Sequence, residues 1–390
     1  MSRINLLVIT NRYPADKDDG ASPFVADFVA GLRKNQIACT VLTPHHSAVH
    51  YDQDSDVVRF RWGEDKRTIG TLPLQSPISW FRIAAYFRNG YQHAVGLHKQ
   101  KQFDFCLALW AAPSGLIANR LRKNFSLPYA VWCLGSDIHT YARLPLVGRM
   151  VVRVLVDAER VYSDGRQLGQ MARCLSGRPY HFLPSLRRID GEFPPDTVTG
   201  TQTLVCPGRV EDAKGVFDLL EAFRLIAADL PSWSLIYVGE GSARPRLEKR
   251  IIKYGLQGRV RTLGFLKSAE MFSVVGRAAA VVIPTRSDSL PLTFGEAMQL
   301  GRPVIVTDVG DLRYFTERYR VGLVVPAGSP GLLADAVRRF ILNPEMCAGR
   351  FDECVRELDV DLAADRFAGW LTERLALQPP ASERVRCRQA

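Results

Sequence analysis

The sequence has no apolar run near the roughly 20 residues that a membrane-spanning helix needs. Its N-terminal apolar stretch is short and lacks a signal-peptide cleavage site, so we interpret it as a first buried strand. The eight cysteines are dispersed without a CxxC pair, which is typical of reduced core cysteines and not of a disulfide framework. Together these absences predict a cytoplasmic protein.

Patterns that bind metal are also scarce. His45, His46 and His50 follow an apolar strand, but they lie in a polar loop without a second group of ligands nearby. The DQDSD run at 52–56 has the letters of a DxD metal motif, yet its polar surroundings favour a solvated loop. We therefore predict no metal site and no cofactor.

Acidic residues are scarce only in the first half of the chain. Residues 1–195 hold 25 lysines and arginines against 16 acidic residues, a net charge of +9, whereas the remainder holds 26 against 24. A basic surface suits nucleic acid, anionic lipid or a phosphorylated acceptor. No nucleic-acid motif is present, so we expect no nucleic-acid partner.

The segment 79–91 of this basic half predicts a helix with an aromatic stripe. Such a stripe is more often the buried face of a core helix, and the alternative is contact with a membrane surface. The stripe residues are Trp80, Ala84, Phe87 and Tyr91, and the arginines Arg82 and Arg88 lie elsewhere on the helix.

Short apolar strands alternate with helical segments throughout both halves, which indicates βαβ units and parallel sheets. We predict an α/β protein with two Rossmann-like, doubly wound domains that face each other across a cleft. The N-terminal domain is predicted at 1–185 and the C-terminal domain at 203–361. The segment between them, 186–202, is rich in Pro, Gly, Thr and charge and reads as a linker.

Two acidic residues near the start of a short helix carry the strongest functional signal. Asp288 and Glu296 lie eight positions apart, and Pro291 between them fixes φ and lacks an N–H, so it belongs to a first helical turn. Asp288 is then in the loop and Glu296 on the helix. A ligand between them would meet the main-chain N–H groups near Leu292 and Thr293, where a helix N-terminus attracts phosphate.

This segment resembles the signature of the retaining glycosyltransferases of the GT-B fold, specifically glycosyltransferase family four. The signature has two acidic residues with seven between them, then EAM, GxPV and a glycine-containing turn, as at 288–310 here. The resemblance implies that Asp288 contacts hydroxyls of a donor sugar and that Glu296 holds the ribose of the nucleotide. Most members have Glu at the first position, so Asp288 is one methylene shorter.

The resemblance extends to other segments. Arg209 and Lys214 match a GRxxxxKG motif, which implies that they stabilise a diphosphate leaving group. The WCLGSD segment resembles an HGxD element, with Leu134 in place of His, and Asp137 is expected either to act on the acceptor or to cap a turn. The predicted catalytic residues are Arg209, Lys214, Asp288 and Asp137, and the predicted donor-binding residues are Gly20, Leu134, Gly135, Gly239, Gly241, Ser289, Leu290, Pro291, Leu292, Thr293 and Glu296.

The implied function is a retaining glycosyltransferase that moves a sugar from a nucleotide-diphosphate donor to a glycan or lipid-linked acceptor, in surface polysaccharide or glycolipid synthesis. The implied location is cytoplasmic, with peripheral contact at an anionic inner membrane leaflet, and the last helix, 362–376, is expected to pack back onto the first domain. We expect activity without a divalent ion. The alternatives are an inverting GT-B transferase with Asp137 or His139 as base, a sugar-nucleotide epimerase, and a non-catalytic nucleotide-sugar-binding protein.

Overall fold

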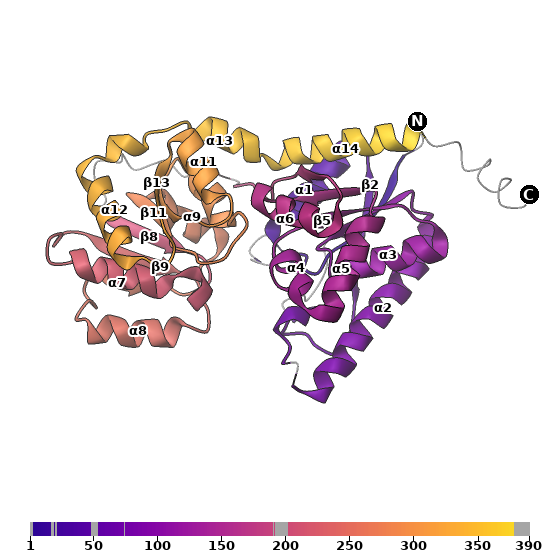
Figure 1. Ribbon diagram of the computed structural model, residues 1–390, viewed down its shortest axis with the longest axis horizontal. Helices are drawn as coiled ribbons and strands as arrows, with labels where there is room; N and C mark the ends of the chain where they lie inside the picture. The colour runs from indigo at the N-terminus through magenta and orange to yellow at the C-terminus, as the bar shows by residue number, and fades with distance from the viewer. Residues whose placement is uncertain are drawn as a thin grey trace, which may run out of the picture.

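The computed structural model describes residues 3–16, 19, 22–47, 54–73, 75–189, 191 and 202–377. They form two α/β domains side by side, and the chain crosses from the second domain back to the first, where the last helix lies (Figure 1). Most of the predicted linker 186–202, the predicted site residue Gly20, and His50 lie outside the described residues.

The first domain is built on a seven-stranded parallel sheet with the order β3-β2-β1-β4-β5-β6-β7. Its strands are β1 (Asn5–Ile9), β2 (Ala38–Pro44), β3 (Val57–Phe60), β4 (Phe105–Leu109), β5 (Tyr129–Cys133), β6 (Arg160–Ser163) and β7 (Tyr180–Phe182). Its helices are α1 (Pro23–Lys34), α2 (Pro77–Lys101), α3 (Ser114–Phe125), α4 (Ser136–His139), α5 (Pro145–Asp157) and α6 (Arg166–Ser176), with short 3-10 turns at Ile69–Thr71 and Tyr141–Arg143.

The second domain is built on a six-stranded parallel sheet with the order β10-β9-β8-β11-β12-β13. Its strands are β8 (Thr203–Pro207), β9 (Ser234–Val238), β10 (Val260–Thr262), β11 (Ala280–Ile283), β12 (Val304–Thr307) and β13 (Gly322–Val325). Its helices are α7 (Val216–Ile226), α8 (Arg244–Lys253), α9 (Ser268–Gly276), α10 (Leu292–Gln299), α11 (Leu312–Tyr319), α12 (Pro330–Leu342) and α13 (Phe351–Leu358), with 3-10 turns at Asp212–Lys214 and Pro344–Cys347, and the chain continues into α14 (Val360–Ala376).

Helices cover both faces of the first sheet, which is why its strands are continuous apolar runs. Alternate residues of β1 point to opposite faces. Leu6 and Val8 pack in the core formed with α1 and α14, whereas Leu7 and Ile9 pack in the core formed with α2, α3 and α5. The chain reverses its winding direction between β1 and β4, and again between β8 and β11, so each sheet has a switch point where a crevice opens at the carboxyl ends of its strands.

Helix α14 belongs to the core of the first domain, although it comes at the end of the described chain. Asp359 caps it by accepting the N–H of Leu362 at 2.8 Å. Its fit against α1 is close, because a Cβ on Gly31 would lie 2.7 Å from that of Ala364. Arg374 adds a two-pronged ion pair to Glu159 at 2.8 and 3.0 Å.

The aromatic stripe predicted on α2 is not its buried face. That face is formed by Ser79, Tyr86, Gly90 and Ala94. Trp80 is 58% exposed. The core-helix interpretation is therefore wrong for the start of the stripe, while the last two stripe residues are half-buried against the core. Within the described ranges, no helix is both long and apolar enough to cross a membrane.

Candidate functional site

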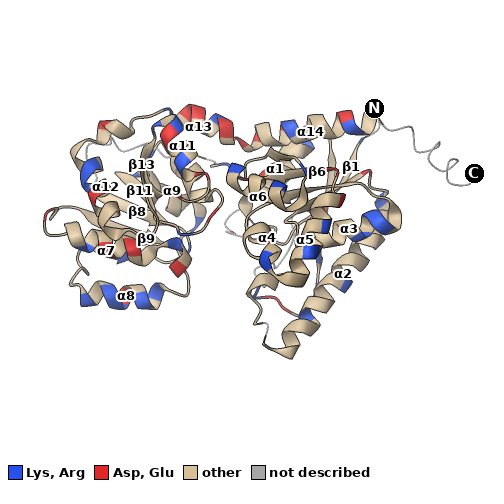
Figure 2. Ribbon diagram, in the orientation of Figure 1, with Lys and Arg blue, Asp and Glu red and all other residues tan. Residues whose placement is uncertain are grey.

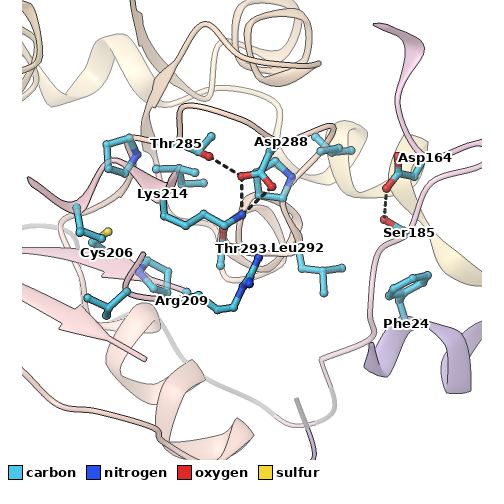
Figure 3. Close-up of a pocket in the computed structure, with 18 of the residues that line it drawn as sticks. Phe24, Asp164, Ser185, Cys206, Arg209, Lys214, Thr285, Asp288, Leu292 and Thr293 are labelled. Atoms are coloured by element: carbon cyan, nitrogen blue, oxygen red, sulfur yellow. Dashed lines mark hydrogen bonds and ion pairs between the residues drawn. The ribbon is translucent and has the colours of Figure 1, made fainter. Parts of the chain in front are cut away.

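A cavity of about 280 Å³ lies between the two domains, at the carboxyl ends of strands from both sheets (Figure 3). Most of its wall comes from the loops after β8 and β11 and from the start of α10. The first domain contributes Phe24, Trp110, Leu134 and Asp164, and the segment after β7 contributes Ser185. The cavity therefore lies at the switch point of the second sheet, where ligands bind in doubly wound proteins.

Lys214 and Asp288 meet at the wall of this cavity. The Lys214 Nζ lies 2.7 Å from both carboxylate oxygens of Asp288, and the Thr285 hydroxyl donates to Asp288 Oδ2 at 2.6 Å. Both side chains are partly buried, being 25% and 19% exposed. Asp288, the first acidic residue of the signature at 288–310, and Lys214, of the GRxxxxKG segment, thus form an ion pair.

Gly215 allows this contact to form. Its φ is +67°, a left-handed conformation that favours glycine, and a Cβ there would lie only 1.9 Å from the carbonyl oxygen of Pro284. The turn after β8 therefore closes directly onto the loop after β11. A larger residue would push Lys214 away from Asp288.

Arg209 and the start of α10 supply further positive charge. Arg209 is exposed, lines the cavity, and forms no ion pair with a described residue. Its side chain extends toward the start of α10 in Figure 3. Pro291 is the N-cap of α10, and Leu290, Leu292 and Thr293 line the cavity as well. The N–H groups of Leu292 and Thr293 at this helix start and the Arg209 guanidinium suit an anionic ligand.

Glu296 is placed differently from its predicted role. It is buried in α10 and forms an ion pair with Arg187, whose Nε lies 2.7 Å from Glu296 Oε1. Arg187 in turn stacks 4.4 Å from the centre of the Phe272 ring. Burial raises the pKa of Glu296, and the charge of Arg187 opposes that rise. Glu296 therefore anchors the segment after β7 to α10 and does not line the cavity.

Asp137 is buried completely and does not line the cavity either. Its carboxylate accepts the N–H of Ala111 at 2.8 Å and that of Leu134 at 3.3 Å. Burial raises the pKa of Asp137 to about 6, although these main-chain donors favour the charged form. Of the two roles expected for Asp137, the turn cap matches this geometry. Asp137 ties together the loop that carries Trp110 and the loop that carries Leu134. Gly135, directly after Leu134, has a φ of +112°.

Gly239 and Gly241 lie behind the cavity wall. A Cβ on Gly239 would lie 2.0 Å from the carbonyl oxygen of Gly208, and one on Gly241 would lie 2.2 Å from that of Val210. They let the loop after β9 pack against the loop that carries Arg209. Their role in this structure is to support the wall, and they make no lining contact.

Asp164, which was not predicted as a site residue, joins the two domains at the cavity. Ser289 of the second domain donates to Asp164 Oδ1 at 2.7 Å, and Ser185 donates to Asp164 Oδ2 at 3.3 Å. The predicted site residue Ser289 thus faces the first domain. Burial raises the pKa of Asp164 to about 8, so its carboxyl is mostly neutral at pH 7. Its position directly after strand β6 is the signal that would have identified it, because functional groups gather at strand ends.

A second carboxylate strengthens this junction. Asp311, at the start of α11, accepts the N–H of Gln167 at 3.0 Å and also that of Arg166, both at the start of α6 in the other domain. Arg166 pairs with Glu357 at 2.5 Å. The wall of the cavity is therefore tied across the domain boundary by side chains from both domains.

The residues with metal-like spacing are engaged elsewhere. In the DQDSD run, Asp54 pairs with Arg33 at 2.5 Å and Asp56 with Lys101 at 2.8 Å. The described residues include no group of three or more His, Cys, Asp or Glu side chains arranged to hold a metal ion.

The chain is similar to known glycosyltransferases over part or most of its length. Residues 192–351 match the model of the glycosyl transferases group 1 family. Alpha-D-kanosaminyltransferase of Streptomyces kanamyceticus is 33% identical over 139 residues, which are 36% of this chain and 36% of that protein. The putative teichuronic acid biosynthesis glycosyltransferase TuaC of Bacillus subtilis is 25% identical over 382 residues, covering 91% of this chain and 95% of that protein.

Solved structures of other proteins share the fold. The structure of Anabaena HepE in complex with UDP-glucose matches with a TM-score of 0.74 at 15% identity, covering 95% of this chain and 100% of that one. The two parallel-sheet domains are those of the GT-B glycosyltransferases, so the predicted fold class is confirmed. The matches also confirm the predicted enzyme class, a nucleotide-sugar-dependent glycosyltransferase.

Proposed function

We propose that the protein is a retaining glycosyltransferase of family four that transfers a sugar from a nucleotide-diphosphate donor to a glycan or lipid-linked acceptor. The observation that carries this proposal is the Lys214–Asp288 pair beside Arg209 and the start of α10. The two cations and the helix N-terminus receive the diphosphate, and the Asp288 carboxylate, held by Lys214 and Thr285, faces the hydroxyls of the sugar. Charge that develops on the leaving phosphate is stabilised by groups already in place.

The state of the carboxylates that line the cavity favours a front-face route over a double displacement through a glycosyl-enzyme intermediate. Asp288 and Asp164 are the acidic residues of its described lining, and both have their oxygens hydrogen-bonded to neighbouring side chains. Asp164 is also mostly neutral at pH 7, because burial raises its pKa to about 8. Neither is set up as a nucleophile.

We therefore infer a reaction on one face of the sugar. The bond from the anomeric carbon to the distal phosphate oxygen breaks, and its electron pair stays on the phosphate. The acceptor hydroxyl oxygen bonds to the same face, and its proton passes to the leaving phosphate. The helix N-terminus, Arg209 and Lys214 stabilise that phosphate, so we propose that no divalent ion is required.

The pathway is proposed from the relatives. TuaC, which aligns over most of both chains, is named for teichuronic acid biosynthesis, and this supports a role in surface polysaccharide synthesis, with glycolipid synthesis as the related alternative. HepE was crystallised with UDP-glucose, which makes UDP-sugars the first donors to test.

Peripheral contact with an anionic inner membrane leaflet is part of the proposal, and one face of the first domain supports it. Helices α2, α3 and α5 carry four, three and two lysines and arginines respectively, nine in all (Figure 2). The single acidic residue of these three helices is Asp157. Large apolar side chains are exposed on the same helices, with Phe81 at 77% and Leu146 at 75%. Cations beside exposed apolar groups suit the headgroup region of an anionic bilayer.

The test is a screen of UDP-, GDP- and ADP-sugars for hydrolysis or transfer, followed by NMR assignment of the product anomer. We expect turnover with one donor class, retention of the anomeric configuration, and full activity in a chelator. An inverted product would indicate an inverting transferase. Epimerisation of the free nucleotide sugar, or binding without turnover, would contradict the transferase proposal.

A further inference from the structure

A second cavity, of about 110 Å³, lies within the first domain and takes no part in the site described above. It is formed by the loops that follow β1, β2 and β3, so it opens at the carboxyl ends of these strands. The chemistry of its lining comes from Asn11, Arg12, His45, His46, Lys66 and Arg67.

The lining has an excess of positive charge. Arg12, Lys66 and Arg67 are exposed side chains, and none forms an ion pair with a described residue. One carboxylate of the described lining, Asp65, lies 3.5 Å from His45 Nδ1. Among the described lining residues, three cations against one carboxylate leave the cavity suited to an anion.

The loop that carries Lys66 and Arg67 is held in shape by Glu64. Its Oε1 accepts the main-chain N–H groups of Lys66 at 3.0 Å and Arg67 at 3.3 Å. Its Oε2 accepts from Arg82 of α2 at 2.6 Å. Glu64 thus orients the loop through its backbone and directs its ion pair to α2. On the opposite wall, Tyr86 anchors Asn11 by donating to its Oδ1 at 3.2 Å.

The position of this cavity relates it to the site between the domains. Trp110, Leu134 and Asp164, which line the first cavity, follow β4, β5 and β6, whereas the second cavity lies over β1, β2 and β3 of the same sheet. Neighbouring strands are about 4.8 Å apart, so β2 and β4, two strands apart, are separated by roughly 10 Å. Both cavities therefore lie along one edge of one sheet.

We propose that the second cavity binds an oxyanion of the acceptor, a phosphate or a carboxylate, at a distance from the hydroxyl that receives the sugar. This inference rests on the proposed transferase function, because it assigns the anion to the acceptor. Arg12, Lys66 and Arg67 bind the anion, and the preformed loop keeps the cost of ordering them low. The substrate class is an anionic glycan or a phosphate-bearing acceptor.

The test compares Lys66→Ala/Arg67→Ala with Arg61→Ala, which removes one exposed cation from the same loop at a position that does not line the cavity. Both are made in the Lys214→Ala protein, which weakens anion binding at the donor site. Thermal-shift titrations with inorganic phosphate and with glucuronate, at constant ionic strength, report binding. We expect the double substitution to weaken phosphate or glucuronate binding at least tenfold, and Arg61→Ala to leave it unchanged.

The probe that responds identifies the source, a phosphate group or a sugar carboxylate. Equal binding of both probes in the two variants would overturn the inference. Donor hydrolysis is measured separately, with Lys66→Ala/Arg67→Ala in the otherwise unchanged protein, and is expected to continue at its usual rate. Loss of hydrolysis there would place these residues in the donor site and also overturn it. Absence of hydrolysis in the unchanged protein would count against the transferase function alone, since anion binding is read independently.

Discussion

The Lys214–Asp288 pair allows a quantitative test of the proposed chemistry. Within the cavity, Lys214 and Arg209 carry positive charge, Asp288 carries negative charge, and Asp164 is mostly neutral, which leaves a net charge near +1. Lys214→Ala reduces this to about zero next to the leaving diphosphate. Removing one preorganised donor of this kind typically raises the barrier by about 2.7–4 kcal/mol, so kcat should fall by about 10²- to 10³-fold.

The partner residue makes the test sharper. Asp288→Asn keeps the shape of the side chain but removes the charge that holds Lys214, whose Nζ contacts both carboxylate oxygens at 2.7 Å. Since the two groups act as a unit, the double variant should lose less than the product of the two single losses. A coupling energy of about 0.5–3 kcal/mol is expected for residues in direct contact.

The assay is the initial rate of donor hydrolysis or transfer at varied donor concentration, with Lys253→Ala on α8 as the control for loss of an exposed lysine. If Lys214→Ala raises KM while kcat stays the same, Lys214 contributes equally to ground state and transition state, and the leaving-group role is refuted. If the losses of the two single variants simply multiply, the two residues do not act as a pair.

Three further predictions concern Asp164, Asp137 and the exposed apolar side chains of α2 and α5. Because burial raises the pKa of Asp164 to about 8, the folded state binds more protons than the unfolded state between about pH 4 and pH 8, so this group's contribution to stability is lost as pH rises. Relative to Asp164→Asn, the free energy of unfolding in urea should fall by roughly 3–4 kcal/mol from pH 5 to pH 8, because one pH unit in this window corresponds to about 1.4 kcal/mol. Parallel curves for the two proteins would refute a raised pKa. Asp137→Ala should lower the Tm and kcat together, because two main-chain N–H groups lose their acceptor at a cost of about 1–3 kcal/mol each. Lost activity with an unchanged Tm would instead support a direct catalytic role for Asp137. Phe81→Ser/Leu146→Ser should reduce sedimentation with anionic vesicles several-fold and leave hydrolysis of soluble donor unchanged, whereas equal sedimentation would exclude this face as the membrane contact.

The fold could be predicted because its signals are local. Each strand is a short apolar run that ends at a turn, and β4, with all five residues buried, shows why such runs form central strands of a parallel sheet. The sequence signal for the start of α10 is also local, because the ring of Pro291 fixes its φ and Pro291 directly precedes the helix. The Lys214–Asp288 contact needed both segments and the close approach at Gly215, which is visible only in three dimensions.

Other parts of the site depend on contacts between distant segments. The spacing between Asp288 and Glu296 does not indicate that Glu296 forms an ion pair with Arg187, which lies far earlier in the sequence. The two roles of Asp137 differ only in burial, which a sequence motif does not specify. Asp164 was missed because its role comes from Ser289, a residue of the other domain.

Asp164 also connects the domain junction to the charge of the cavity. If Asp164 were ionised, its negative charge would offset the positive charge of Arg209. The net charge of the cavity would then be near zero, which does not favour a diphosphate. Burial keeps it mostly neutral at pH 7, and the bonds from Ser289 and Ser185 satisfy its oxygens. Any opening of the domains that separates Ser289 from Asp164 would expose the carboxyl to water and favour its ionised form. The closed arrangement is therefore the one in which the cavity has its full positive charge, so donor diphosphate and domain closure should favour each other.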